Sequence, residues 1–261
     1  MKRTILFLLI LSALVLTACS GNSTPTLIPT VVLSSKPAAA SSSVTASGEV
    51  VPVQKASLSF PMTGTVTNVT VKEGQMVFAG QPLVTLDTTI LQANVKEAQS
   101  GVAAAQTQVK YLKRIGTDQE HIDSAQADVE SAQASFDSAN AMLAQAMLTA
   151  PFNGTIASIE ISPAETVISG QVVIMMGDLS NFQIETTDLS ERDVTDVQVG
   201  QPARASVPAL NQTLTGKVVD VARVSTTVGG DVVYKVTIQL DKQPQNLLWG
   251  MTADVQIDTG N

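Results

Sequence analysis

The chain has 261 residues, of which 44% are hydrophobic and only 3% aromatic, and its formal net charge is −8. This length allows more than one domain, with cores built from aliphatic side chains and methionine. An acidic chain without a basic cluster cannot displace counterions from phosphates. The composition therefore argues against nucleic-acid binding and against attachment to an anionic membrane by charge alone.

The amino terminus has the pattern of a secretory signal. Two basic residues precede an apolar run from Ile5 to Leu16, which is too short for a bilayer span of about 20 residues. The run ends in Leu16-Thr17-Ala18-Cys19, which resembles the lipobox of bacterial lipoproteins. We therefore predict a signal peptide over residues 1–18 and lipid attachment at Cys19, the chain's only cysteine. The protein would then be anchored to the cell membrane, facing the periplasm or extracytoplasmic side.

The segment after the cysteine predicts a disordered tether. Residues 19–47 are mostly Ser, Thr, Pro and Ala, and Lys36 is the only charged side chain among them. Such a composition cannot bury enough apolar surface to fold.

An internal repeat lies on either side of a helical insert. Residues 61–87 and 151–177 align without a gap at an offset of 90, with six identities. Aliphatic positions match as well: Val66, Val69, Val71, Leu83, Val84 and Leu86 fall opposite Ile156, Ile159, Ile161, Val173, Ile174 and Met176. Each copy has the β-rich runs and Gly-containing turns of short strands, too few to be stable alone. The two copies are therefore predicted to face each other as a two-layer sandwich.

Residues 88–147 change to a helical period. Apolar residues recur at alternating steps of three and four over residues 91–112 and 122–146, as in two heptad seams. We expect capping boxes at Thr89 with Gln92 and at Thr117 with Glu120, and Gly116 should end the first helix. Two helices of about 40–45 Å joined by about three residues must be antiparallel neighbours. Because their other faces are polar, the sequence predicts a projecting hairpin.

These features resemble the membrane fusion proteins, also called periplasmic adaptor proteins. The first half-motif is Phe60-Pro61-x-x-Gly64-x-Val66 with Val71-Lys72-Glu73-Gly74-Gln75-x-Val77, and the second begins Leu148-Thr149-Ala150-Pro151-Phe152-x-Gly154. The resemblance covers about residues 45–258. It implies a mainly β fold with an inserted α-helical coiled-coil hairpin at 88–147. A lipoyl-like β-sandwich would come from 48–87 and 148–180, with 48–56 also able to pair with a β-barrel at 181–261.

The barrel region also reads as β structure by itself. Turn signals separate β-rich runs at Phe182–Thr186, Pro202–Val207, Gly216–Val224, Asp231–Leu240 and Thr252–Ile257. One helical signal is present, in which Ser190 would cap a helix from Glu191 to Val197.

The resemblance implies a non-enzymatic adaptor subunit of an efflux or export pump. Its partners would be an inner-membrane transporter of the ATP-binding cassette or resistance-nodulation-division type, an outer-membrane channel as outer conduit, and further copies in a ring, often of six. The predicted contact residues are Arg114, Gly116, Thr117 and Asp118 at the hairpin tip and Glu191, Arg192, Gly229 and Gly230 on the barrel.

No catalytic or metal site is predicted. His121 is the only histidine, and Met62, Met175, Met176 and Met251 occur at strand positions, where methionine is usually core. In true lipoyl and biotinyl domains, the acceptor lysine lies at the turn between the two halves. The helical insert occupies that turn here, and neither Lys55 nor Lys72 lies at it. No lipoyl or biotin cofactor is therefore expected. Two alternatives stay open at this point: an extracytoplasmic lipoprotein that binds a solute or metal, and a carrier subunit of an enzyme.

Overall fold

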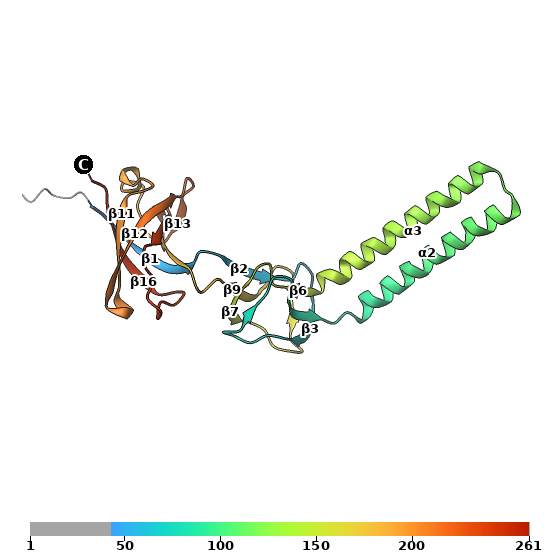
Figure 1. The fold of residues 1–261 in the computed structure, drawn as a ribbon, viewed down its shortest axis with the longest axis horizontal. Helices are drawn as coiled ribbons and strands as arrows, with labels where there is room; N and C mark the ends of the chain where they lie inside the picture. Colours follow the sequence, from blue (N-terminus) through green and yellow to red (C-terminus); the bar gives the residue numbers. More distant parts are fainter. Residues whose placement is uncertain (1–42, 261) are drawn as a thin grey trace, which may run out of the picture. The chain divides into compact units, whose positions relative to one another are not determined.

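The computed structural model describes residues 43–260, and the predicted signal peptide, Cys19 and nearly all of the tether lie outside this range. The described chain forms a β-sandwich, a helical hairpin and a β-barrel (Figure 1). None of its helices combines the length and the hydrophobicity that a bilayer crossing requires.

The sandwich consists of two four-stranded sheets. One has the order β2-β9-β7-β4, from β2 (Lys55–Ser59), β9 (Val172–Gly177), β7 (Gly154–Ile159) and β4 (Met76–Val77). The other has the order β6-β5-β3-β8, from β6 (Met147–Thr149), β5 (Pro82–Leu86), β3 (Gly64–Val69) and β8 (Thr166–Val167). Each sheet mixes strands of both half-motifs, so neither half is a folding unit alone.

The two halves exchange equivalent hydrogen bonds. The amide of Gly74 donates to the carbonyl of Ile156 at 2.8 Å, and the amide of Ala164 donates to the carbonyl of Val66 at 2.8 Å. An offset of 90 residues converts each bond into the other. The same offset relates the pairing of β3 with β8 to that of β4 with β7. The repeat is therefore an interlocked pair related by an approximate two-fold axis.

The sandwich core is built from the matched aliphatic positions of the repeat. Val66 and Ile156 are almost completely buried, as are Leu86 and Met176. Of the positions predicted to match, only Val69 and Ile159 are partly exposed, and both pack against this core.

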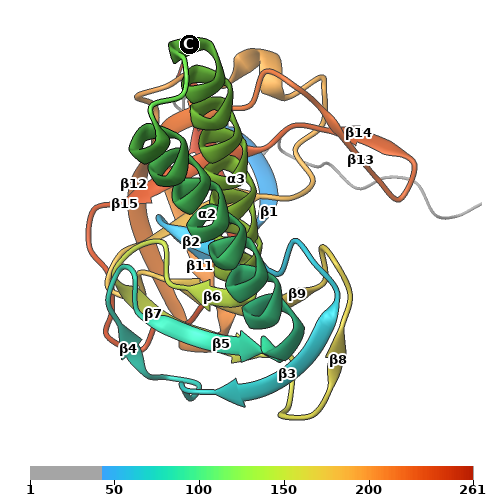
Figure 2. The ribbon, with the colours of Figure 1, turned by 90° about the vertical axis from the view of Figure 1, so that its right-hand side faces the viewer.

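The hairpin consists of α2 (Thr89–Ile115) and α3 (Gln119–Gln145), of 27 residues each. They run side by side in both ribbon views (Figures 1 and 2). All predicted seam residues are buried or half-buried, whereas nearly every other side chain of the two helices is exposed. At 1.5 Å per residue each helix is about 40 Å long. The predicted antiparallel hairpin is confirmed, and Gly116 ends α2 with a left-handed backbone as predicted.

Both predicted capping boxes are wrong by one residue. The residue that precedes α2 is Thr88, whose hydroxyl accepts a hydrogen bond from Gln92 at 2.8 Å. The residue that caps α3 is Asp118, whose carboxylate accepts from the amide of His121 at 3.0 Å. Thr117 is unsuitable because its amide closes the preceding turn onto Leu112. Asp is as good a cap as Thr, so the sequence could not separate the two positions.

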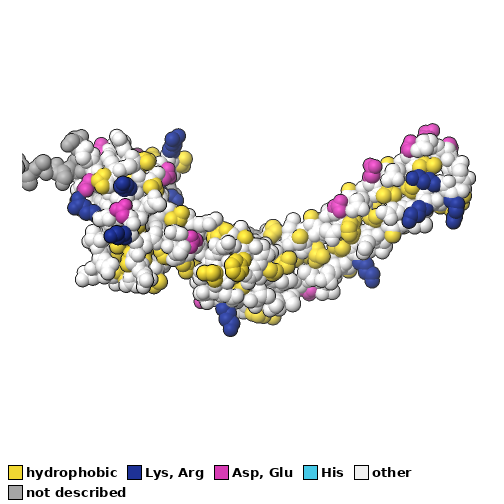
Figure 3. All heavy atoms as spheres, viewed as in Figure 1, with side chains coloured by type: hydrophobic (Ala, Val, Ile, Leu, Met, Phe, Trp, Pro, Cys, Tyr) yellow, Lys and Arg dark blue, Asp and Glu magenta, His cyan; other side chains and the backbone are white. Residues whose placement is uncertain are grey.

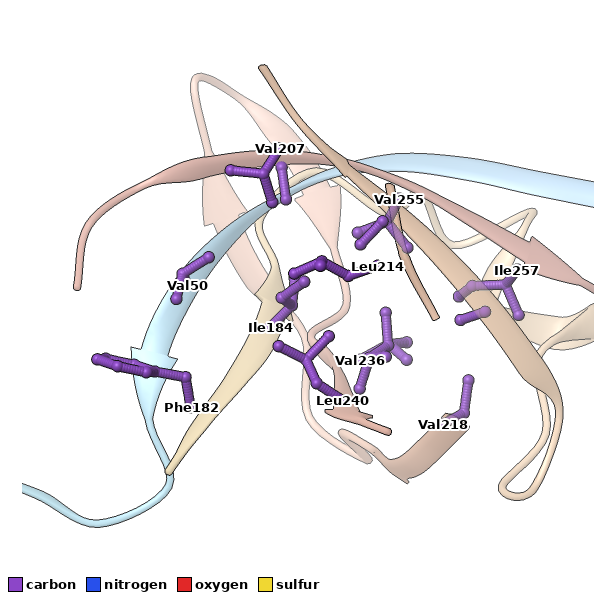
Figure 4. Close-up of a cluster of buried hydrophobic side chains, with 14 of the residues drawn as sticks. Val50, Phe182, Ile184, Val207, Leu214, Val218, Val236, Leu240, Val255 and Ile257 are labelled. Atoms are coloured by element: carbon purple, nitrogen blue, oxygen red, sulfur yellow. The ribbon is translucent and has the colours of Figure 1, made fainter. Parts of the chain in front are cut away.

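The barrel closes from six strands in the order β1-β10-β15-β12-β11-β16. They are β1 (Ser43–Pro52), β10 (Phe182–Thr186), β15 (Val236–Leu240), β12 (Gln212–Val221), β11 (Pro202–Val207) and β16 (Thr252–Asp258). Alternate side chains of these strands fill the interior, among them Ile184, Val236 and Val255 (Figure 4). Closure leaves no free strand edge along the barrel wall.

Two barrel elements differ from the sequence prediction. The run Asp231–Leu240 is interrupted, because the amide of Tyr234 donates to the carbonyl of Leu189 at 2.8 Å and separates β14 (Asp231–Val233) from β15. β14 instead pairs with β13 (Thr226–Val228) as a two-stranded ribbon. The helix expected after Ser190 is only the 3₁₀ turn η1 (Val194–Asp196), because the next residue, Val197, leaves helical geometry to enter the barrel core. A second 3₁₀ turn, η2 (Pro208–Leu210), follows β11.

Two antiparallel chain segments join the barrel to the sandwich. The amide of Val53 donates to the carbonyl of Asn181, and the amide of Asp178 donates to the carbonyl of Gln54, each at 2.9 Å. These bonds continue the pairing of β1 with β10 into that of β2 with β9.

Candidate partner-binding surfaces

The hairpin tip presents the residues that the sequence predicted there. Arg114 is exposed in the last turn of α2, with its guanidinium carbon 5.7 Å from the centre of the Tyr111 ring. Gly116 has a φ of 71°, which suits glycine and lets the chain turn back within three residues. Thr117 is half-buried in the turn and Asp118 is exposed, so the tip offers both charge and backbone to a partner.

Asp118 is held by the start of its own helix. Its Oδ1 lies 2.6 Å from Nδ1 of His121 and also accepts the His121 amide. The hydrogen bond with the His121 side chain and then that with its amide keep the pKa of Asp118 below its usual value, so the carboxylate stays charged at neutral pH. His121 thereby supports the cap of α3.

The barrel brings three of its four predicted contact residues together. Glu191, Arg192 and Gly230 line one open pocket of about 590 Å³, which also has Asp188 and Asp231 in its wall. An isolated bridge between Ser190 and Val233 joins the loop after β10 to the ribbon and so creates this pocket. Gly229 stands outside the pocket lining, in the ribbon turn, where both glycines have positive φ.

The ribbon and the segment before it also expose aliphatic side chains that the sequence analysis did not select. Val228 and Val232 of the ribbon are 54% and 40% exposed, and Val224, just before the ribbon, is 79% exposed. Exposed apolar side chains beside a charged pocket are typical of a protein contact. Val224 and Val232 lie in runs that the sequence predicted as strands, and such runs do not show which side chains stay exposed.

Comparison with solved structures shows which proteins this chain resembles. A chimeric protein of MacA and MexA, containing the Pseudomonas aeruginosa MexA α-hairpin domain, is 26% identical; the match has a TM-score of 0.74 and covers 84% of this chain and 81% of that one. The membrane fusion protein Spr0693 of Streptococcus pneumoniae matches with a TM-score of 0.66 at 21% identity, over 84% of this chain and 100% of that one. This chain is thus similar in structure to membrane fusion proteins, also called periplasmic adaptor proteins.

The relatives found by sequence comparison also match most of this chain. An uncharacterized protein of Haemophilus influenzae is 26% identical over 219 residues, which are 82% of this chain and 57% of that protein. The protein YdhJ of Escherichia coli is 25% identical over 187 residues, 65% of each chain. This chain therefore spans a little over half to about two thirds of the length of these relatives. No family model matches the chain.

The comparison confirms the predicted fold. The mainly β fold with an inserted coiled-coil hairpin is the fold of the MacA–MexA chimera. The structural neighbours are membrane fusion and adaptor proteins, in line with the prediction that this chain is not an enzyme. The methionines predicted at strand positions belong to two different cores, because Met62 and Met176 pack in the sandwich whereas Met251 packs against the barrel core.

The two hairpin helices carry opposite charges, a feature that the sequence analysis missed. α2 has four basic side chains and one acidic, a formal charge of +3, whereas α3 has five carboxylates and no Lys or Arg, a formal charge of −5. All ten charged side chains are exposed. Within residues 43–260 no ion pair joins one helix to the other. Figure 3 shows basic side chains along α2 near the tip and acidic ones along α3.

The charges form stripes at matching heights. Asp123, Glu130 and Asp137 recur every seven residues along α3, and Lys96 and Lys110 lie fourteen apart along α2, so each set follows one line on the side of its helix that faces away from the seam. Counted from Thr117 in the turn, Lys110 is about level with Asp123 and Lys96 with Asp137. Each hairpin thus presents a basic edge and an acidic edge of the same spacing.

Proposed function

We propose that this chain is a membrane fusion protein, the extracytoplasmic adaptor subunit of an efflux or export pump that links an inner-membrane transporter to an outer conduit. The observation that carries the proposal is the likeness of sandwich, hairpin and barrel together to the MacA–MexA chimera over 84% of the chain. The neighbour EmrA is likewise a periplasmic adaptor protein, although at 16% identity it supports the fold alone. A lipid on Cys19 would hold the adaptor at the membrane.

The barrel surface is the proposed contact with the transporter. The pocket beside Glu191 and Arg192 and the exposed valines of the ribbon combine charged and apolar groups, as protein interfaces do. The hairpin tip is the proposed contact with an outer-membrane channel where the cell has one. The transporter would be of the ATP-binding cassette or the resistance-nodulation-division type.

The charge stripes support self-association into a ring. If copies stand side by side with their hairpins parallel, α2 of one copy faces α3 of the next, and Lys96 and Lys110 meet Asp137 and Asp123 at equal height. The contact is heterologous, so it repeats from copy to copy until the ring closes. Six is the number of copies that the family resemblance implies.

The alternative of a metal-binding lipoprotein has less support. In the part of the chain that the structure describes, no group of three or more His, Cys, Asp or Glu side chains could hold a metal ion. That the protein carries no lipoyl or biotin remains part of the proposal, and the intact mass of the purified protein tests it.

Photo-crosslinking in cells tests the proposed function. A photoreactive amino acid at Val228 of the ribbon should capture an inner-membrane transporter, identified by mass spectrometry. The matched control places it at Gln99, which is exposed on α2. Capture of no transporter from Val228, together with unchanged export when the gene is deleted, would refute the adaptor role.

A further inference from the structure

Two glutamates stand directly opposite each other on the barrel wall. Glu49 of β1 pairs with Glu185 of β10, so both side chains lie on the same face of the sheet. Glu185 is compensated twice, because its Oε2 lies 3.2 Å from Nζ of Lys55 and 3.3 Å from Nζ of Lys235. Burial raises the pKa of Glu185, but the two ammonium groups together lower it more, so the pKa lies below its usual value and the carboxylate is charged.

Glu49 has no such compensation. Among residues 43–260 no side chain forms an ion pair with its carboxylate, and no hydrogen bond reaches that carboxylate. Like charges directly opposite each other destabilise a sheet. Lys55 and Lys235 balance the formal charge of the two glutamates, but both ammonium groups bind Glu185, so the half-buried Glu49 carboxylate has no direct ion pair.

The Glu49 carboxylate borders an apolar cleft. A pocket of about 650 Å³ is lined by Glu49, by Met175 and Leu179, and by the barrel loop that carries Leu248 and Trp249. Its floor includes Ile156 and Phe182, which are buried. Leu248 is 62% exposed at the rim. A smaller pocket of about 330 Å³ shares Glu49, Met175 and Trp249 with the first, so these three side chains stand between the two.

We propose that this cleft binds lipophilic organic cations, a ligand class that goes beyond the adaptor role. Aliphatic and thioether walls of this volume suit a drug-sized apolar body. The face of an indole and an unpaired carboxylate both attract a cation and both disfavour an anion. The cleft contains a single carboxylate, whereas a hard metal ion would need several oxygen ligands.

Tetraphenylphosphonium and tetraphenylborate test the proposal, because they share four phenyl groups and differ in the sign of their charge. Trp249 is the only tryptophan in the chain, so its fluorescence reports on the cleft. With the purified full-length chain in a non-ionic detergent, we expect saturable quenching by the phosphonium and much weaker quenching by the borate. Equilibrium dialysis of labelled phosphonium gives an independent measure of binding.

Two variants test the role of the charge. Glu49→Gln should weaken phosphonium binding by about tenfold or more, whereas Glu97→Gln, on the exposed side of α2, should leave it unchanged. Glu49→Gln removes a like-charge pair, so the melting temperature should stay equal or rise. Leu248→Lys, at an exposed position, should repel the phosphonium and strengthen borate binding.

Three results would overturn the proposal: equal responses to the two ions, no fluorescence change with the phosphonium, or unchanged binding in both Glu49→Gln and Leu248→Lys. None of these results bears on the adaptor role, because the binding test involves no transporter and no export.

Discussion

Gly74 and Ala164 stand at equivalent positions of the two half-motifs, and both have a left-handed backbone, with φ of 77° and 68°. Their amides make the two equivalent hydrogen bonds between the halves. Glycine adopts this conformation freely, whereas a Cβ strains it by about 1 kcal/mol or more. One half of the sandwich therefore holds a strained residue that the other half avoids.

Exchanging the two side chains should have opposite effects on stability. Ala164→Gly should raise the free energy of unfolding by up to about 1 kcal/mol, and Gly74→Ala should lower it by about 1 kcal/mol or more. No atom lies within 4 Å of a Cβ added at Gly74, so strain alone causes the loss. Urea denaturation followed by circular dichroism measures both. Ala157→Gly in β7, where φ is not positive, is the control and should destabilise; a similar loss for Ala164→Gly would contradict the strain account.

The sequence was sufficient where the structure depends on local periodicity. The hairpin seam and the two equivalent sets of core positions were predicted correctly, because heptads and the repeat leave a regular trace in the residues. The sequence could not show that Ser190 and Val233 bridge, which brings Glu191 and Arg192 next to Gly230. Ser190 and Val233 lie some 40 residues apart in the sequence, so no local sequence pattern indicates that they pair. The opposition of Glu49 and Glu185 likewise depends on a strand register that only the closed barrel sets.

Excising the hairpin should leave a folded β protein. Leu91 and Ala146 pack against the sandwich core, so they should be kept and only residues 93–143 replaced by a short Gly-containing turn. We expect the helical signal in circular dichroism to disappear while a cooperative melt remains, because Leu91 is the one residue of α2 and α3 that packs against the sandwich core and Ala146 follows α3. A chain that fails to fold would show that the hairpin supports the sandwich more than these contacts imply.

Charge reversal should control self-association. Replacing Lys96 and Lys110 with Glu should weaken assembly by about tenfold or more at roughly 0.05 M salt, and roughly 0.5 M salt should weaken the wild type similarly. Adding Asp123→Lys and Asp137→Lys should restore assembly by reversing both edges. Sedimentation velocity measures it, and Lys242→Glu, in an exposed barrel loop, is the control. Assembly that is indifferent to salt and to both sets of changes would exclude the charged edges as the contact.

Membrane attachment should depend on Cys19. Because the apolar run before it is too short for a bilayer span, Cys19→Ala should leave an unlipidated precursor that a fatty-acid analogue no longer labels. Metabolic labelling followed by membrane fractionation measures this, with the wild-type chain as reference. Labelling that persists in the variant would show that the lipid is not attached to Cys19.

Export measurements can distinguish the role of the hairpin tip from that of the barrel surface. Asp118→Lys is unsuitable for this purpose because it also removes the cap of α3. Arg114→Glu is cleaner, since Arg114 is exposed and forms no ion pair in the described chain, and exposed charges contribute only about 0–1 kcal/mol to stability. A like-charge clash at an interface costs several kcal/mol. If the tip contacts a channel, Arg114→Glu should reduce export while the melting temperature and the membrane fraction stay unchanged.

Variants of the barrel surface test the proposed contact with the transporter. Arg192→Glu in the pocket and Val228→Asp on the ribbon should abolish export in any cell, because the transporter contact is needed whether or not an outer channel exists. Lys242→Glu should leave export intact. Export is compared at matched protein levels, because a difference in abundance would imitate a lost contact. Full export by Arg114→Glu together with loss in the barrel variants would assign the tip no partner in that cell. At the core of an interface, the carboxylate of Val228→Asp would be buried without water or a partner, which would weaken the contact. Full export by the barrel variants would therefore show that the ribbon does not contact the transporter.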